Sequence, residues 1–494
     1  MRVLRPILLF VLPAFLIPEI QAAECNYWPI KVEQSDPGAA SGRTSTSTQA
    51  FGPLLFSAKD AQGGVADGFR PFFVARKSPD GKQQETNFLY PLLINRRYGG
   101  ENHWSFLELI NSSKPSDPAA PGIRSFDVWP FYFSRQTGEP DTSYRAVFPL
   151  QGHIVHRLGY DRLDWALFPI YARFERHGVA TTSMFWPIFK DIEGDGNHGF
   201  AVWPLIGHRV KEGVSRDDFA LWPLLYRRES RLGTPEASSS IGVLPFYARD
   251  LAPGSRSETF LWPFFGYTHR TAPYRYDEAR WLWPFLVQGS GDSRLVNRWA
   301  PFYTHSNIKG NDKRWVLWPV FRQQAWTDGG IAQTKTQVLY FVYWSLRQER
   351  AGGATPASPA AEKTHLWPLY SYWNNGAGSR QLQLVSPLEV FFQANESVRL
   401  SYSPLFALFR YERSGAGEVR SSLLWNAISW RRSPGQREFH LGPLFSVDVA
   451  DDRRRVAVGC GLISFRRQPG GPWRLRLFDF SDKADKPPQS TVSK

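Results

Sequence analysis

The chain has 494 residues, of which 42% are hydrophobic and 15% aromatic, and its formal net charge is +14. Beyond the N-terminus, no segment has 18 consecutive apolar residues, which excludes a bundle of membrane-spanning helices. The two cysteines, Cys25 and Cys460, lack the paired spacing of zinc ligands. A chain of this length suggests several domains, but the repeat described below overrides that expectation.

The first 23 residues have the pattern of a signal peptide. Arg2 and Arg5 precede an apolar stretch at 7–18, and small residues follow before position 24. We therefore predict a signal peptide at 1–23 and an exported protein. Because exported proteins seldom meet nucleic acid, the positive charge predicts no nucleic-acid partner. It favours membrane lipids, acidic glycans or glycolipids instead.

One motif recurs from residue 29 to residue 461, with Trp-Pro between apolar residues, as in AVWPLI at 201–206 and ALWPLL at 220–225. Twenty-three copies, some degenerate, follow one another at steps of 15 to 27 residues. Such regular spacing indicates one structural unit copied along the chain. We therefore predict a single repeat-built β domain at 24–480, followed by a disordered polar tail at 481–494. The complete motif pairs are Trp129 and Pro130, Trp186 and Pro187, Trp203 and Pro204, Trp222 and Pro223, Trp262 and Pro263, Trp283 and Pro284, Trp318 and Pro319, and Trp367 and Pro368.

A single repeat, DDFALWPLLYRR at 217–228, indicates what the unit forms. Apolar residues lie on both faces of an extended chain around Trp222, and charged residues close both ends. A proline in a short aromatic and aliphatic run disfavours a helix. We therefore predict strands centred on Trp-Pro and buried on both sides, about 24 in number. Polar linkers such as 193–199 and 252–257 would close the antiparallel hairpins.

Two architectures fit these strands. The apolar run matches the ~9–11 residues that a membrane-spanning strand needs, and basic residues flank it. The final segment at 473–480 alternates apolar residues and ends on Phe480. In these features the chain resembles bacterial outer-membrane β-barrel proteins as a class. That resemblance implies an all-β antiparallel meander closed into a large transmembrane barrel. Closure would bring Cys25 and Cys460 to one seam, where they could form a disulfide.

The proline itself favours the alternative, a β-solenoid or stacked-sheet repeat array. Proline cannot donate to a strand ladder, and some twenty unpaired positions inside lipid would be costly. In an array, Trp-Pro would form a corner with a short strand on either side.

Candidate chemistry is sparse. Residues 194–199 match a dinucleotide fingerprint, but they lie in a linker and are interpreted as a turn. The acidic residues around Asp195 lack the bidentate glutamate of a calcium loop. His153, His208, His269 and His305 stand alone in the sequence, and no nucleophile motif occurs. We expect no catalytic, cofactor or metal site.

The sequence thus predicts a non-enzymatic outer-membrane barrel acting as a channel, export conduit or envelope scaffold, with amphipathic lipid or glycan as possible cargo. The alternative is an exported repeat protein, in the periplasm or at the cell surface, that binds acidic glycans or lipids. The sequence indicates no particular oligomeric state.

Overall fold

The computed structural model describes residues 26–37, 44–60, 62–117, 119–351, 360–392, 395–414, 417–450 and 453–479. The predicted signal peptide, Cys25 and the predicted tail at 481–494 lie outside these residues. Within them the chain is all-β, as expected, and forms 44 strands with two short α-helices. Two compact units are present: a terminal unit (residues up to 80, 369–389 and from 394) and a central unit (81–368 with 390–393).

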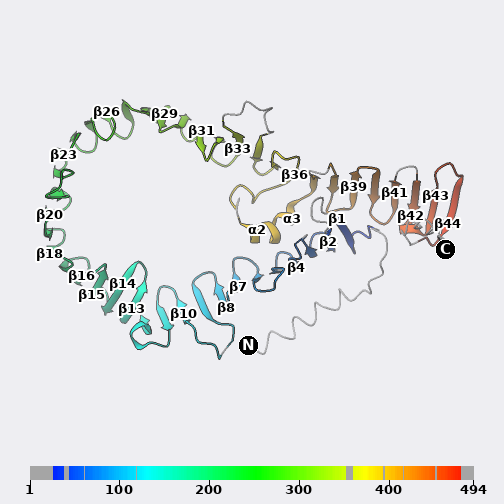
Figure 1. The fold of residues 1–494 in the computed structure, drawn as a ribbon, viewed down its shortest axis with the longest axis horizontal. Coiled ribbons are helices and arrows are strands. Elements are labelled where there is room, and N and C mark those ends of the chain that lie inside the picture. The colour runs from blue at the N-terminus through cyan, green and yellow to red at the C-terminus, as the bar shows by residue number, and fades with distance from the viewer. Residues whose placement is uncertain are drawn as a thin grey trace, which may run out of the picture. The chain divides into compact units, whose positions relative to one another are not determined.

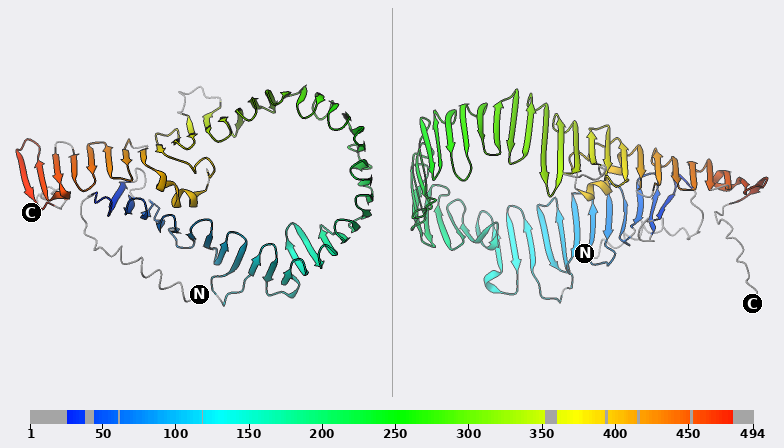
Figure 2. Two further views of the ribbon diagram at one scale, coloured as in Figure 1. Left: turned by 180° about the vertical axis from the view of Figure 1, so that it is seen from behind. Right: turned by 45° about the horizontal axis from the view of Figure 1, so that its top comes forward.

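The strands form antiparallel meanders in which each strand pairs with its neighbours in chain order, one meander in the central unit and two in the terminal unit, β1 to β5 and β35 to β44 (Figures 1 and 2). No pairing among the described residues joins the first strand of either unit to its last. The strands of the central unit are β6 Gln84–Phe88, β7 Leu93–Tyr98, β8 Glu101–Phe106, β9 Ile110–Pro115, β10 Arg124–Val128, β11 Tyr132–Gln136, β12 Tyr144–Val147, β13 Gln151–Arg157, β14 Tyr160–Ala166, β15 Tyr171–Arg176, β16 Val179–Met184, β17 Phe189–Gly194, β18 Asn197–Val202, β19 Ile206–Lys211, β20 Ser215–Ala220, β21 Leu225–Ser230, β22 Ser238–Val243, β23 Tyr247–Ala252, β24 Ser255–Phe260, β25 Phe265–Arg270, β26 Tyr276–Leu282, β27 Leu286–Gly291, β28 Arg294–Trp299, β29 Tyr303–Ile308, β30 Asn311–Val316, β31 Phe321–Asp328, β32 Ile331–Val338, β33 Tyr343–Arg350 and β34 Ala361–Leu366.

The terminal unit combines both ends of the described chain. Its helices are α2 Glu396–Ser401 and α3 Ser403–Phe406, and it has a short 3₁₀ helix at Gly459–Gly461. The central unit has a 3₁₀ helix at Pro140–Thr142. The strands of the terminal unit are β1 Val32–Pro37, β2 Thr44–Ala50, β3 Leu55–Lys59, β4 Val65–Phe69, β5 Phe73–Lys77, β35 Tyr370–Asn374, β36 Arg380–Leu384, β37 Phe409–Arg413, β38 Val419–Leu423, β39 Ile428–Ser433, β40 Gln436–Leu441, β41 Phe445–Ala450, β42 Arg453–Val458, β43 Ile463–Arg467 and β44 Trp473–Leu477.

The Trp-Pro motif forms turns, so the prediction that it lies at strand centres is wrong. Strand β20 ends at Ala220, β21 begins at Leu225, and the residues between them reverse the chain. The amide of Leu224 donates to the carbonyl of Leu221 over 2.8 Å and closes the turn. Each repeat therefore supplies two short strands instead of one long strand. For that reason the described residues form 44 strands, whereas the sequence predicted about 24.

Each motif proline lies in a turn, where its missing N–H interrupts no strand pairing. The Trp222–Pro223 peptide is cis, as it is at every complete motif pair, which is the arrangement of a type VI turn. The amides of Leu221 and Trp222 each donate over 2.7 Å to the preceding turn, at Leu205 and Pro204. Hydrogen bonding between repeats thus continues through the turns, although Pro223 donates nothing.

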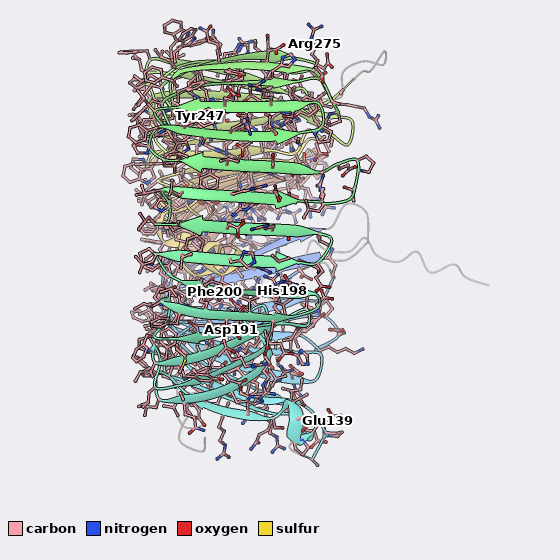
Figure 3. All side chains as sticks on the ribbon, turned by 90° about the vertical axis from the view of Figure 1, so that its left-hand side faces the viewer. Glu139, Asp191, His198, Phe200, Tyr247 and Arg275 are labelled. Atoms are coloured by element: carbon pink, nitrogen blue, oxygen red, sulfur yellow. The ribbon has the colours of Figure 1, made fainter. Side chains whose placement is uncertain are left out.

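The polar linkers close the other edge of the sheet. In the turn between β17 and β18, Asp195 and Gly196 have φ of 47° and 70°, the positive pair that a tight type I′ hairpin requires. The interpretation of 194–199 as a turn is confirmed. Because every repeat contributes two strands, all Trp-Pro turns of a unit share one edge and all polar turns share the other. Figure 3 shows this division, with Tyr247 toward one edge and Arg275 and Glu139 at the other.

Aromatic rings packed on glycines stabilise this thin sheet. Gly207 of β19 faces Phe219 of β20 across the strand pair, and the ring occupies the space that a Cβ at Gly207 would fill. Gly152 and Trp165 of β13 and β14 repeat the arrangement. Trp165 belongs to a buried cluster with Phe133, Tyr144, Ala146, Ile154 and Ala172. Glycine here serves as a platform for a neighbouring ring.

We expect Gly207→Val to lower the free energy of unfolding by roughly 1–3 kcal/mol, because the added methyl groups overlap the Phe219 ring. Urea denaturation would measure the loss. In the double variant Gly207→Val, Phe219→Ala the space is vacated, so the valine should cost less than it does alone. Additive losses in the two single variants would contradict this packing.

In the terminal unit the buried Arg70, in the turn between β4 and β5, connects helix α2 to the turn between β2 and β3. The Nε of Arg70 donates to the carbonyl of Leu400 over 2.6 Å, and its Nη1 donates to Pro53 over 2.9 Å. Its guanidinium lies 3.6 Å above the Phe56 ring. Burial, followed by the charge of Arg410, lowers the pKa of Arg70 to about 9. The guanidinium is thus held by carbonyls and an aromatic ring, which partly replace its lost hydration.

The N-terminal segment packs on the C-terminal repeats through Asn426, the residue that replaces the motif proline there. Asn26 Nδ2 donates to the Asn426 carbonyl over 2.6 Å, and Gln34 Nε2 donates to Asn426 Oδ1 over 2.8 Å. Asn426 Nδ2 in turn donates to Gln49 Oε1. A proline could not supply this side-chain amide, which explains why this copy of the motif is degenerate.

The backbone carbonyl of Asn26 lies 4.0 Å from Cys460 Sγ, and Cys25, which directly precedes Asn26, lies outside the described residues. We predict that peptide mapping under non-reducing conditions will recover Cys25 and Cys460 in one disulfide-linked pair. The physical reason is that Asn26, which follows Cys25 directly in the sequence, lies beside Cys460. Alkylation of both thiols in unreduced protein would refute the pairing.

Candidate functional site

The largest unusual surface is the edge formed by the Trp-Pro turns of the central unit, which we name the turn edge. Its side chains are exposed instead of forming a core: Leu221 and Trp222 are each 52% exposed, and Leu261 is 54% exposed. The motif tryptophans with at least a third of their surface exposed are Trp129, Trp186, Trp203, Trp222, Trp262, Trp283, Trp318 and Trp367. Sequence reasoning had favoured core packing for these rings, and the turn geometry explains why that was wrong.

Rings of successive turns pack against each other along the turn edge. The centroid of Phe168 lies 5.3 Å from that of Phe148 and 5.5 Å from that of Trp186. Further along, Trp203 and Trp222 have centroids 6.1 Å apart. Tilted aromatic pairs at such distances add modest stability beyond area burial. Together with the hydrogen bonds between turns, they make the turn edge a preorganised apolar strip.

In strands β20 and β21 the apolar character ends about two residues from the Trp-Pro turn. In β21, Leu225 and Tyr226 are followed by Arg227 and Arg228, and β20 carries Asp217 and Asp218 at the same height. Because neighbouring residues of a strand point to opposite faces, charges appear on both faces of the sheet. Two residues at about 3.4 Å each give the apolar zone a depth of roughly 7 Å beyond the turns. The sheet is therefore amphipathic along its strands, not from face to face.

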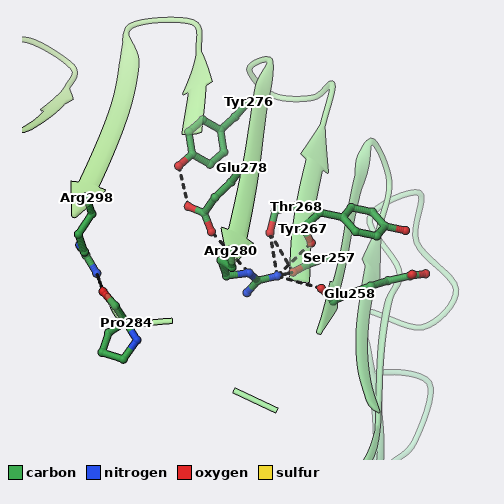
Figure 4. Close-up of polar contacts among 9 residues, drawn as sticks. All are labelled: Ser257, Glu258, Tyr267, Thr268, Tyr276, Glu278, Arg280, Pro284 and Arg298. Atoms are coloured by element: carbon green, nitrogen blue, oxygen red, sulfur yellow. Dashed lines mark hydrogen bonds and ion pairs between the residues drawn. The ribbon is translucent and has the colours of Figure 1, made fainter. Parts of the chain in front are cut away.

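Arginines connect strands close to this boundary (Figure 4). The Nη2 of Arg280 on β26 donates to the carbonyls of Glu258 and Tyr267, over 3.1 and 3.0 Å. It lies against Gly266, where a Cβ would approach to 3.1 Å. The Nη1 of Arg298 donates to the carbonyl of Pro284 in a Trp-Pro turn over 3.4 Å. Arg280 thus connects β26 to β24 and β25, and Arg298 connects β28 to a Trp-Pro turn.

The histidines that stand alone in the sequence meet aspartates on the neighbouring strand. His208 Nδ1 lies 2.5 Å from Asp218 Oδ1, and His153 Nδ1 lies 2.5 Å from Asp164 Oδ1. His269 with Asp277 and His305 with Asp312 form the same kind of pair. Three of the four aspartates also contact an arginine two residues away on their own strand, as Arg216 does for Asp218. Two of the four pairs share a sequence pattern: His153 and His208 each follow a glycine, and Asp164 and Asp218 each precede an aromatic residue on the next strand.

The His–Asp pairs have the character of structural ion pairs. Burial would raise the pKa of Asp218, but hydrogen bonds from His208 and Arg216 outweigh it and lower that pKa below 3.8. The carboxylate therefore stays ionised and bonded near neutral pH. Among the described residues, no group of three or more His, Cys, Asp or Glu could hold a metal ion. The arrangement joins neighbouring strands side chain to side chain.

Since the folded-state pKa of Asp218 lies below its usual value, its contribution to stability is present above about pH 4 and is lost as the pH falls through the folded-state pKa. We expect Asp218→Asn to lower the urea midpoint at neutral pH and to have a smaller effect at acid pH, as wild-type Asp218 becomes protonated. A deficit of equal size at both pH values would contradict an ionic role for Asp218.

No protein-family model matches this chain, and comparison with the curated proteins finds no similar sequence. In the part of the chain that the structure describes, no helix is both long and apolar enough to cross a membrane. The geometry of the turn edge is therefore the main guide to function.

Proposed function

We propose that this is a non-enzymatic protein of the bacterial outer envelope whose turn edge is embedded in a lipid surface, where the sheet acts as a scaffold or as the wall of a conduit. The observation that carries the proposal is the exposed aromatic strip of the central unit. Monomeric soluble proteins rarely expose a continuous apolar patch beyond a few hundred Å². Tryptophan and other aromatic rings are favoured at the interface between lipid and water.

Strand length supports embedding of the edge over complete spanning. A spanning strand needs ~9–11 residues with one continuous apolar face, whereas the central strands have four to eight residues. Asp217 and Asp218 place charge on both faces a short way from the turns. The apolar depth of roughly 7 Å matches proteins that enter only the headgroup and upper acyl region, about 5–10 Å deep. A closed spanning barrel is therefore the less favoured form of this proposal.

The second candidate, an exported protein that binds acidic glycans, is favoured by the basic net charge of +14 alone. It needs no apolar edge. The two candidates differ in what releases the protein from its partner. Contacts with acidic glycans weaken with salt, whereas embedded aromatic residues need detergent for release.

The test compares charge placed on the two edges of one sheet. We expect Leu221→Glu combined with Leu261→Glu to weaken sedimentation with phosphatidylcholine vesicles by about tenfold or more, since a carboxylate is costly to place in lipid. The matched control is Val214→Glu, at an equally open position, 44% exposed, in a polar turn. That variant should bind vesicles as the wild type does. Equal losses from both edges, or release of the wild type by salt alone, would overturn the embedded edge.

A further inference from the structure

On one face of strands β39 to β44 of the terminal unit, the residues at mid-strand are all apolar, which is not the case at the corresponding positions of β19 to β21. Strand pairing places one residue from each strand in a row across this face: Trp430, Phe439, Val447, Val456, Phe465 and Leu475. The corresponding row in the central unit contains His208, Asp218 and Arg227. We name the residues of the first row the C-terminal apolar face. Leu475 is 58% exposed and Phe465 is 43% exposed.

The opposite face of the same strands is already occupied. Val32 and Gln34 of β1 lie beside Ser429, Glu438 and His440, with which they line a common groove. Further along, Asp479 accepts hydrogen bonds from Arg466 and Ser464. Charged groups on that side are thus largely satisfied within the chain.

A row of arginines borders the C-terminal apolar face at its polar-turn end. The register places Arg432 opposite Arg437, and Arg454 opposite Arg467, on the same face as the apolar row. Arg432, Arg437 and Arg454 line a groove of about 840 Å³ together with Val447 and Val456. Within the described residues that line this groove, none is acidic, and no ion pair to the four arginines is found there.

An apolar surface bordered by arginines that have no carboxylate partner in the described part of the chain matches one kind of ligand, an anionic amphiphile. From Arg432 to Ile428 on β39 the face extends four residues, about 13 Å at 3.3 Å per residue. That length accommodates acyl chains lying along the strands, with the headgroup at the arginines. Arginine binds phosphate through two parallel hydrogen bonds, which gives geometry as well as charge. An acidic glycan would use the arginines and leave the apolar row exposed to water.

We propose that this face binds an acylated lipid with a phosphate-bearing headgroup, the phosphate contacting Arg432, Arg437 and Arg454 and the acyl chains covering Val447, Val456 and their row. The acyl chains would then point toward the edge on which the C-terminal motif copies form turns. This inference deepens the proposed function and rests on it, because it assumes that the protein meets a membrane.

The experiment measures how strongly the full mature chain prefers phosphatidylcholine vesicles containing phosphatidylglycerol over phosphatidylcholine alone. We expect the triple variant Arg432→Gln, Arg437→Gln, Arg454→Gln to lower that preference by about tenfold or more. The matched control, Arg453→Gln, Arg474→Gln, Arg476→Gln, removes the same charge from the opposite face of the same sheet. It should lower the preference much less. Equal effects of the two triple variants would mean a general charge effect and would overturn the site.

Further arms identify the ligand and separate the two proposals. Val447→Thr with Val456→Thr should weaken binding of the phosphatidylglycerol vesicles while the arginines stay intact. If inorganic phosphate alone displaces the wild type completely from them, the site recognises phosphate and the lipid proposal fails. Binding to phosphatidylcholine alone should persist in the arginine variant and fall in Leu221→Glu, Leu261→Glu. Its complete absence in the wild type would refute the proposed function itself, not only this site.

Discussion

Proline has no amide proton, and that constraint organises the molecule. A proline in the middle of a strand would interrupt the ladder, so each Trp-Pro pair occupies a turn, where its neighbours supply the hydrogen bonds. The amide of Trp222 donates to the carbonyl of Pro204 in the preceding turn, and the same connection links Trp318 to Pro301. Trp-Pro turns alternate with polar turns along the chain. The motif therefore occurs on one edge of the sheet only. Strand length and the position of the aromatic side chains follow from this placement.

The consequence is a sheet whose polarity changes along its strands. Most antiparallel sheets separate apolar from polar side chains by face, but here Leu225 and Tyr226 are apolar on opposite faces, and Arg227 and Arg228 are charged on opposite faces. Rings packed on glycines, as for Phe219 on Gly207, and cross-strand pairs such as His208 with Asp218 hold the charged half together. Such a sheet cannot bury its turn edge within itself. We propose that lipid covers it.

The terminal unit shows how the same repeat is adapted. Where the N-terminal segment crosses the C-terminal repeats, asparagine replaces proline, and Asn426 bridges Asn26, Gln34 and Gln49. Where the strands continue beyond that segment, valine and phenylalanine take positions that carry charges in the central unit. One face becomes apolar from the turns to mid-strand, and the arginines that border it at the polar-turn end have no acidic partner among the described residues. The departures from the repeat are therefore where specific binding is expected.

Much of the fold was predictable from the sequence. The 15–27-residue repeat established an all-β chain, and glycine with asparagine or aspartate, as at 193–199, predicted hairpin turns correctly. The position of Trp-Pro could not be settled in this way, because LWPLL has the same alternation of apolar residues whether it is a buried strand or a turn between two strands. The proline was the correct clue to the corner, and it was outweighed by the length of the apolar run. The His–Asp pairs required knowledge of the strand register, although Gly-His and Asp-Phe in successive strands were visible.

By itself, then, the sequence determined the repeated unit, the β structure and the segregation of polar linkers from aromatic motifs, because these depend on local propensity and backbone chemistry. Only the tertiary structure decided that each repeat makes two strands, that all motif turns share one edge, and that the arginines of four C-terminal strands border one apolar face. Those properties depend on the register between strands, and a shift of one residue would move every side chain to the other face.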